Sequence, residues 1–267
     1  MDSVTIVKIG GSLISHKNAY CSPNIPAIQS FIRTISQNQS ILKNKLILVL
    51  GGGSYGNGVP IRYNLQNSSH SWQDIDLAMM TVKMFEWMTK ISMICRDHDL
   101  PCYPFQTSSY LVSEKGKPLR FFVEPIIRVL SMGLIPVLSG DLVFDSLEDF
   151  VIFSSDGIPE LFIEKINVKR IVMLTNVPGV LSYSSNLPLT IPSITKENYK
   201  IILEEVGASE QQDVTGGMKN KVKALLRLAE RGIESVICDG RDPSIMISAI
   251  QDPVPKGTVI ESWKKKN

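Results

Sequence analysis

The sequence predicts an α/β protein with a mostly parallel central sheet. Short β-branched runs alternate with longer segments of helical period, which is typical of parallel strands joined by crossover helices. The chain has 267 residues, of which 43% are hydrophobic and 20% charged. This composition provides for a sizeable core and excludes a disordered or low-complexity chain.

The expected strands are mostly apolar throughout, as strands buried on both faces should be. They are Val4 to Ile9, Leu46 to Leu50, Leu134 to Leu138, Arg170 to Leu174 and Ser235 to Cys238. The segments between them have the length and period of helices.

Two helices have a clear apolar period. The first has the recurring residues Ile75, Ala78, Met79, Val82 and Phe85, and its pattern continues through Met88 and Ile91 to about His98. Its methionine stripe (Met79, Met80, Met84 and Met88) is interpreted as core packing. The second helix opens after Gly216-Gly217, ends near Gly232, and has the apolar residues Val222, Leu225, Leu226 and Ala229.

Charge and cysteine usage narrow the function classes. Lys and Arg number 28 against 26 Asp and Glu, a balance that argues against nucleic-acid binding as the main task. The chain has no apolar run of membrane-spanning length and no recognisable leader, so we expect a cytoplasmic protein without membrane contact. Its four cysteines lack metal-ligand spacing, so we expect reduced thiols and no protein-bound metal cluster.

Three segments are suited to binding anions. Gly10-Gly11 follow the first expected strand, and the glycine-rich segment from Gly51 to Gly58 follows the second, so both lie where α/β sheets bind ligands. The third is the helix start from Asp213 to Lys221, whose amides favour a negative charge. Each alone is also explained by an ordinary turn or helix start.

Together these segments favour phosphoryl transfer. They combine exposed amides with lysines and lack a nucleophile-base pair, as expected for catalysis by positioning and charge neutralisation. A hydrolase is disfavoured because no GxSxG motif is present and none of His16, His70 and His98 has a triad context.

The order and spacing of these motifs resemble the amino acid kinase family, in particular its isopentenyl phosphate kinases and fosfomycin kinases. The resemblance covers nearly the whole chain and includes KIGGSLISHK from Lys8, GGGSYGNG from Gly51, PFQTSSYLV from Pro104, SGDLVFD from Ser139, FSSDGIPE from Phe153, LTNVPGVL from Leu174 and DVTGGMKNK from Asp213. It implies an α/β sandwich of three layers, formed by a single amino acid kinase domain that spans residues 1–267. The acceptor lobe would span about 1–165 and the nucleotide lobe about 166–267.

The resemblance also implies roles for individual residues. Lys8 and Lys221 would neutralise the transferring phosphoryl group, and Asp156 would orient both lysines. The substrate side would comprise Ser12, Lys17, Gly52, Gly53, Ser54, Asn57, Ser155 and Thr215. The nucleotide side would comprise Lys8, Gly10, Gly11, Thr175, Asn176, Gly179, Gly216, Gly217 and Lys221. ATP would be the donor, with Mg²⁺ held chiefly by phosphates and water.

Two departures from the family pattern bear on the substrates. Asn57 stands where these relatives have a histidine, so a neutral amide replaces a group that can become a cation. The usual TDVDG motif is here Thr175-Asn176-Val177-Pro178-Gly179, which lacks both carboxylates. The first departure bears on the acceptor and the second on nucleotide preference.

Together with the anion-binding segments, the resemblance implies an ATP- and Mg²⁺-dependent small-molecule kinase acting on a phosphate or phosphonate oxygen. It also implies a homodimer, for which the helix from Ile75 would supply the contact. Two alternatives stay open: a kinase of the same fold acting on a carboxylate, carbamate or other oxyanion, and a nucleotide- or metabolite-binding regulator without turnover. Retention of Lys8, Asp156 and Lys221 argues against the regulator.

Overall fold

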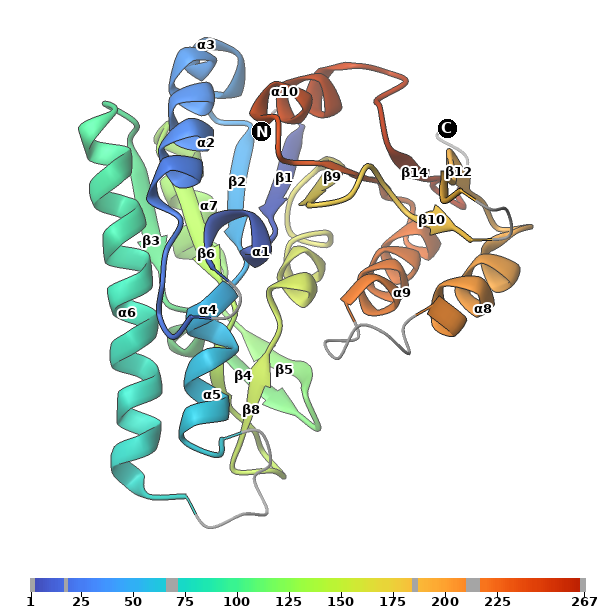
Figure 1. Cartoon of the computed structure of the whole chain (residues 1–267). Coiled ribbons are helices and arrows are strands. Elements are labelled where there is room, and N and C mark those ends of the chain that lie inside the picture. The colour runs from blue at the N-terminus through green and yellow to red at the C-terminus, as the bar shows by residue number, and fades with distance from the viewer. Residues whose placement is uncertain (1–2, 17–18, 66–71, 184–186, 210–216, 265–267) are drawn as a thin grey trace. The chain divides into compact units, whose positions relative to one another are not determined.

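A computed structural model describes residues 3–16, 19–65, 72–183, 187–209 and 217–264, except for the side chains of residues 207–209 (Figure 1). The chain divides into two compact units, Met1–Asn167 and Val168–Asn267. Each unit is described by itself below.

The sheet of the first unit is entirely parallel. Its strand order is β1-β2-β6-β3, with β1 at Val4–Ile9, β2 at Leu46–Leu50, β6 at Ile135–Ser139 and β3 at Cys102–Phe105. All residues of β1, β2 and β6 are buried, because helices cover a sheet of this kind. Three of the expected strands are thereby confirmed, two with identical bounds and β6 shifted by one residue.

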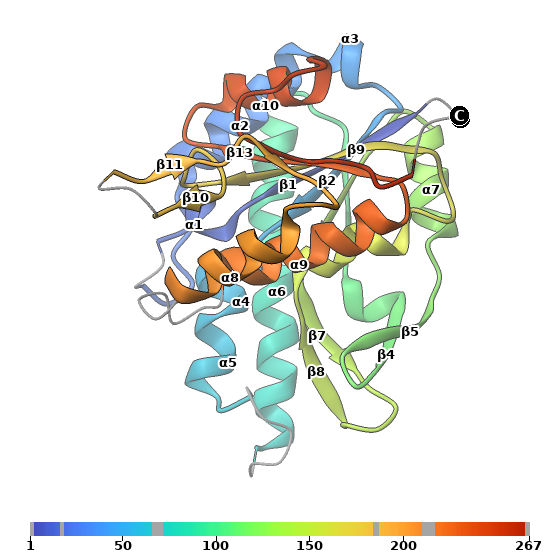
Figure 2. The same cartoon turned by 90° about the vertical axis from the view of Figure 1, so that its right-hand side faces the viewer.

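The helices of the first unit are α1 (Gly11–Ile14), α2 (Ile25–Gln37), α3 (Gln39–Leu42), α4 (Gly53–Gly56), α5 (Gly58–Arg62), α6 (Asp74–Asp97) and α7 (Glu124–Ser131), with short turns of 3-10 helix at η1 (Thr107–Ser109) and η2 (Ser155–Leu161). In Figure 1 the long helix α6 runs beside α2, with which it packs. Two antiparallel hairpins, β4 (Leu111–Glu114) with β5 (Lys117–Phe121) and β7 (Asp141–Phe144) with β8 (Phe150–Phe153), project together from this unit (Figure 2).

Helix α6 confirms the predicted helix, but only the later part of the predicted apolar pattern, Met88 and Ile91, is buried. Gln73 and Asp76 form a capping box at its start, which satisfies amides that the helix itself leaves unpaired. The buried side chains are Met80, Met84, Trp87, Met88, Ile91, Ile94 and Cys95. Three residues of the methionine stripe therefore pack in the core, whereas Met79 is only half-buried. Ile75, Val82 and Phe85 instead lie on the exposed side.

The second unit has a mixed sheet. Its order is β9-β13-β14-β12, with β9 at Val168–Thr175, β13 at Glu234–Asp239, β14 at Thr258–Ile260 and β12 at Ser193–Ile194. Strands β9 and β13 are parallel, as are β12 and β14, whereas β13 and β14 are antiparallel. The two strands expected in this half are confirmed, each extended by one or two residues at either end.

The other elements of the second unit are the hairpin β10 (Leu181–Ser182) with β11 (Leu189–Thr190), and the helices α8 (Tyr199–Ser209), α9 (Gly217–Glu230) and α10 (Pro243–Gln251). Helices α8 and α9 pack side by side (Figure 2). All four apolar residues predicted for the second helix are buried on α9. In the described part of the chain, no helix is both long and apolar enough to cross a membrane.

Candidate active site

A buried ion pair joins Lys8 to Asp156 in the first unit. Lys8 is the next-to-last residue of β1 and is only 4% exposed. Its ammonium contacts the carboxylate of Asp156 at the start of η2, which packs against β1, β2 and β6. The hydroxyl of Ser154 accepts a hydrogen bond from the Asp156 amide and so caps this turn. Because an unpaired lysine is costly to bury, the carboxylate stabilises the charged amine at the end of the strand.

The two glycine segments of this unit pack against each other through their backbones. A Cβ atom on Gly11 would overlap the backbone of Gly53, and one on Gly51 would overlap the backbone of Gly11. Gly53 has a φ of +51°, in the left-handed region that glycine adopts most readily. Absence of side chains is therefore required for the loops to approach, independently of any ligand.

The remaining substrate-side predictions divide between the surface and the interior. Ser12 and Asn57 are exposed, and Asn57 joins α4 to α5 without capping α5 through its amide. Ser155 is buried at the start of η2. Ser54 is also buried, and its hydroxyl is engaged with the backbone of Ser22.

A carboxylate that sequence reasoning did not single out lies just after β6. Asp141 is 2% exposed and accepts hydrogen bonds from Gln106 Nε2 at 2.7 Å, Ser108 N at 3.0 Å and Leu142 N at 2.9 Å. Burial raises its pKa, although these hydrogen bonds oppose the rise. Asp141 thereby holds the start of η1 against the end of β6, and the sequence signal for it was its place in the SGDLVFD motif.

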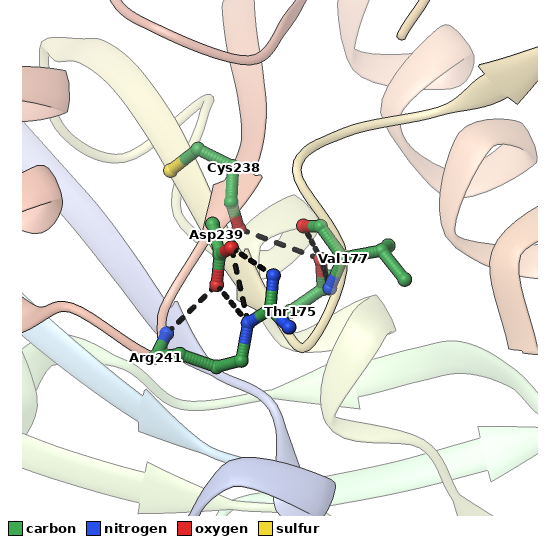
Figure 3. Close-up of polar contacts among 5 residues, drawn as sticks. All are labelled: Thr175, Val177, Cys238, Asp239 and Arg241. Atoms are coloured by element: carbon green, nitrogen blue, oxygen red, sulfur yellow. Dashed lines mark hydrogen bonds and ion pairs between the residues drawn. The ribbon is translucent and has the colours of Figure 1, made fainter. Parts of the chain in front are cut away.

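Three nucleotide-side residues, Thr175, Asn176 and Gly179, lie at or just after the end of β9, and Figure 3 shows the polar contacts of Thr175. The Thr175 hydroxyl donates to the carbonyl of Val177 at 2.9 Å and lies 3.4 Å from the Cys238 carbonyl, so it shapes the turn after the strand. Asn176 is exposed. Gly179 is buried, and a Cβ there would lie 2.6 Å from the hydroxyl of Thr258, so close packing explains this glycine.

Asp239 places a carboxylate at the same strand end. It is the register partner of Thr175 across β9 and β13. The Arg241 Nε lies 2.9 and 3.1 Å from its two oxygens, and this guanidinium lowers the pKa of the Asp239 carboxyl (Figure 3). The sequence did not indicate this pair, because only the register of β9 and β13 brings Asp239 beside Thr175. Asp239 thus places a carboxylate next to the turn whose TNVPG sequence lacks the two carboxylates of the family motif.

Helix α9 carries the last of the described predictions. Gly217 is its first residue, and the Lys221 ammonium donates to the Gly217 carbonyl at 2.9 Å. Lys17, Thr215 and Gly216 lie outside the described residues. The structure thus brings Lys8, Gly10, Gly11, Gly52, Gly53 and Asp156 to strand ends of the first unit, and Thr175, Asn176 and Gly179 to a strand end of the second.

Comparison with known proteins supports the same chemistry. The model of the amino acid kinase family matches residues 3–239. Isopentenyl phosphate kinase of Methanocaldococcus jannaschii is 31% identical over 237 residues, covering 86% of this chain and 89% of the relative. Acetylglutamate kinase of Staphylococcus epidermidis is 24% identical over 281 residues, covering 97% and 99%. A crystal structure of isopentenyl phosphate kinase has a TM-score of 0.79 at 22% identity, covering 96% and 99%, which shows a shared fold.

Proposed function

Since the chain belongs to the amino acid kinase family and is a phosphotransferase, we propose that it transfers the γ-phosphoryl group of ATP to a phosphate oxygen of a small molecule. The observation that carries this proposal is the buried Lys8–Asp156 pair beside two interlocked glycine segments. A fixed cation and bare amides at strand ends suit a transition state whose charge spreads over phosphoryl oxygens.

In this proposal the described residues divide the work between charge and shape. Lys8 and Lys221 neutralise the transferring group, and Asp156 orients Lys8. The amides after β1 and β2 cradle the phosphoryl oxygens, and the turn after β9 shapes the nucleotide side. Among the described residues no group of three or more His, Cys, Asp or Glu could hold a metal ion. Mg²⁺ would be held chiefly by the phosphates of ATP and by water.

The acceptor is the finer part of the proposal. The similarity to isopentenyl phosphate kinase favours a monophosphate acceptor. A phosphonate has similar charged oxygens and is therefore included. The exposed neutral Asn57 favours a second candidate, a carboxylate acceptor like that of the acetylglutamate kinase relative. A dianion that loses a charge-assisted hydrogen bond loses about 1.5–3 kcal/mol, whereas a carboxylate has less charge to satisfy.

The deciding experiment measures ATP consumption against isopentenyl phosphate, fosfomycin and N-acetylglutamate. Product analysis by ³¹P NMR separates a new phosphoanhydride from an acyl phosphate. Turnover of a phosphate or phosphonate supports the proposal, and turnover of the carboxylate alone supports the second candidate. ATP binding without turnover of any acceptor class would contradict both and favour a regulator.

Substitution at Asn57 predicts opposite signs for the two candidates. With a phosphate acceptor, Asn57→His should preserve or improve kcat/KM, because a partly protonated imidazole adds attraction to a dianion. With a less charged native acceptor, the same change should lower kcat/KM for that acceptor and raise trace activity on isopentenyl phosphate. Asn57→Gln is the matched neutral control. Unchanged kinetics with every acceptor would show that position 57 does not face the acceptor.

We further propose a homodimer that uses the exposed side of α6. Four large apolar side chains of this helix are at least half exposed: Ile75, Val82, Phe85 and Met93. Tyr103 on the edge strand β3 is nearly half exposed. Such a row of large apolar side chains is typical of an interface rather than of a solvated surface. Light scattering should give the mass of a dimer for the wild type and of a monomer for Phe85→Glu, and a monomeric wild type would contradict the proposal.

A further inference from the structure

Two buried serines tie together the segments that carry the predicted phosphate-side residues. Ser15 is 3% exposed, and its hydroxyl donates to the Gly11 carbonyl at 2.9 Å. The same oxygen accepts a hydrogen bond from the Ser54 amide at 2.8 Å. The Ser15 side chain therefore bonds the backbones of both glycine segments.

Ser54 extends the connection to the segment between α1 and α2. Its buried hydroxyl accepts from the Ser22 amide at 2.9 Å and donates to the Ser22 carbonyl at 3.1 Å. The Ser22 carbonyl also accepts from the His16 amide at 2.9 Å. These contacts join Ser54 to Ser22 and Ser22 to His16.

The two glycines next to these hydrogen bonds, Gly11 and Gly53, cannot be replaced by a residue with a side chain without a collision. A Cβ atom on Gly53 would overlap the Ser15 hydroxyl, so Gly53 and Ser15 are matched in size and position. A Cβ on Gly11 would meet the Gly53 backbone on the other side. The relative position of the two segments is thus set by backbone packing together with one hydroxyl group.

We propose that Ser15 and Ser54 are positioning residues for phosphoryl transfer, which together form a serine bridge that fixes the separation of the two glycine segments. The inference rests on the proposed function and assigns neither serine a contact with substrate. Without the Ser15 hydroxyl, the buried Ser54 amide must find another partner, and a small loop shift displaces the amides that face the transferring group. Misplacement of about 1 Å can lower a rate about 100-fold.

Kinetics of Ser15→Ala tests this role with ATP and isopentenyl phosphate, or N-acetylglutamate if that is the acceptor turned over. We expect kcat to fall more than tenfold while KM for ATP changes less than threefold, because the bridge orients reacting groups rather than the bulk of the nucleotide. Ser15→Cys keeps a side chain of similar size but replaces the hydroxyl by a thiol that bonds only weakly, so it should lower kcat as Ser15→Ala does. Ser54→Ala should raise KM for the acceptor, since it loosens the Ser22 side of the bridge.

A matched control separates positioning from general stability. Ser113 is another fully buried serine of the same unit, and its hydroxyl bonds the Asp145 carboxylate at 2.7 Å in the hairpin region. Ser113→Ala removes a buried hydroxyl as Ser15→Ala does, so we expect a similar fall in Tm with kcat within twofold of wild type. An equal loss of kcat in both variants would overturn the positioning role.

Hydrogen–deuterium exchange provides a readout that needs no turnover. The Ser54 amide should exchange faster in Ser15→Ala, and the Ser22 amide faster in Ser54→Ala, with the β2 amides unchanged. Full kcat in Ser15→Ala would overturn the inference while leaving the proposed function intact. A wild type that phosphorylates no acceptor would overturn the proposed function first, and unchanged exchange in both variants would show that the bridge itself is absent in solution.

Discussion

Each unit contains a buried ion pair between a basic residue on a strand and a carboxylate, and the two pairs lie at opposite strand ends. Lys8 is near the carboxyl end of β1, where it meets Asp156. Arg170 is near the amino end of β9, where its Nε donates to Glu234 at 2.7 Å. In parallel sheets ligands bind beyond the carboxyl ends of the strands, so only the first pair is placed for chemistry.

The surroundings of the two pairs differ in the same sense. Arg170 also donates to the carbonyls of Ala249 at 2.9 Å and Asp252 at 2.6 Å, so its guanidinium closes the carboxyl end of α10. These hydrogen bonds satisfy carbonyl groups at the end of the helix, and the positive charge of Arg170 interacts favourably with the helix dipole there. Lys8 lies instead beside glycine segments with bare amides. Burial of an ion pair thus does not by itself indicate a catalytic role. The end of the strand at which the pair lies is the better indication.

The largest effect is expected for Lys8→Met. We expect kcat to fall about 100- to 1000-fold with a much smaller change in KM for ATP, because the lysine interacts most strongly with charge that develops in the transition state. Lys221→Met and Asp156→Asn should change the same parameter. Lys83→Met is the matched control, since Lys83 forms an ion pair with Glu86 in the same unit. Steady-state kinetics decides, and wild-type kcat in Lys8→Met would refute phosphoryl transfer at this site.

Arg170→Met should lower stability and leave kcat nearly unchanged, in contrast to Lys8→Met. Removing one partner of a largely buried pair should lower the free energy of unfolding by about 3–5 kcal/mol, while kcat stays within about twofold of wild type. Arg241→Met is the matched control, because the Arg241–Asp239 pair is exposed on the arginine side and should change stability by about 0–1 kcal/mol. Urea denaturation measures both variants. A loss of kcat in Arg170→Met without loss of stability would break the comparison.

The smallest effect concerns a carboxylate of the first unit away from the strand ends. Asp145 accepts hydrogen bonds from Ser113 Oγ and from the amides of Lys115, Gly116, Leu147 and Glu148, which joins the two hairpins. Burial would raise its pKa, but these hydrogen bonds outweigh burial and hold the pKa below its usual range. A depressed pKa stabilises the fold above the unfolded value near 4, and the contribution is lost as pH falls.

Asp145→Asn should therefore lower Tm at pH 7 and narrow its difference from wild type as pH falls from about 5 to 3. Thermal unfolding followed by circular dichroism over this pH range measures the effect. Glu114→Gln, a surface carboxylate of the same hairpin, serves as the control and should change Tm little at any pH. A constant difference between Asp145→Asn and wild type across the range would show that the charge of Asp145 contributes nothing to stability.

Local pattern was sufficient for the main elements. Continuous apolar runs predicted β1, β2, β6, β9 and β13 because strands buried on both faces need no polar positions. The amphipathic period predicted α9 together with its buried face. The edge strand β3 was missed, since it contains Pro104 and two exposed positions and so lacks an apolar run. Strands β4 and β5 were missed for the same reason, since both are short and at least half of their residues are not buried.

What the sequence determined by itself is which residues are chemically equipped for anions: glycines and lysines near strand and helix ends, and Asp156 within a motif typical of the family. The tertiary structure decided what each of them touches. It turned Ser54 inward to Ser22, required Gly11 and Gly53 for backbone packing, and set Asp239 beside Thr175 by strand register. The physical reason is that such contacts join residues far apart in the chain, so they depend on how whole elements pack, which no local pattern encodes.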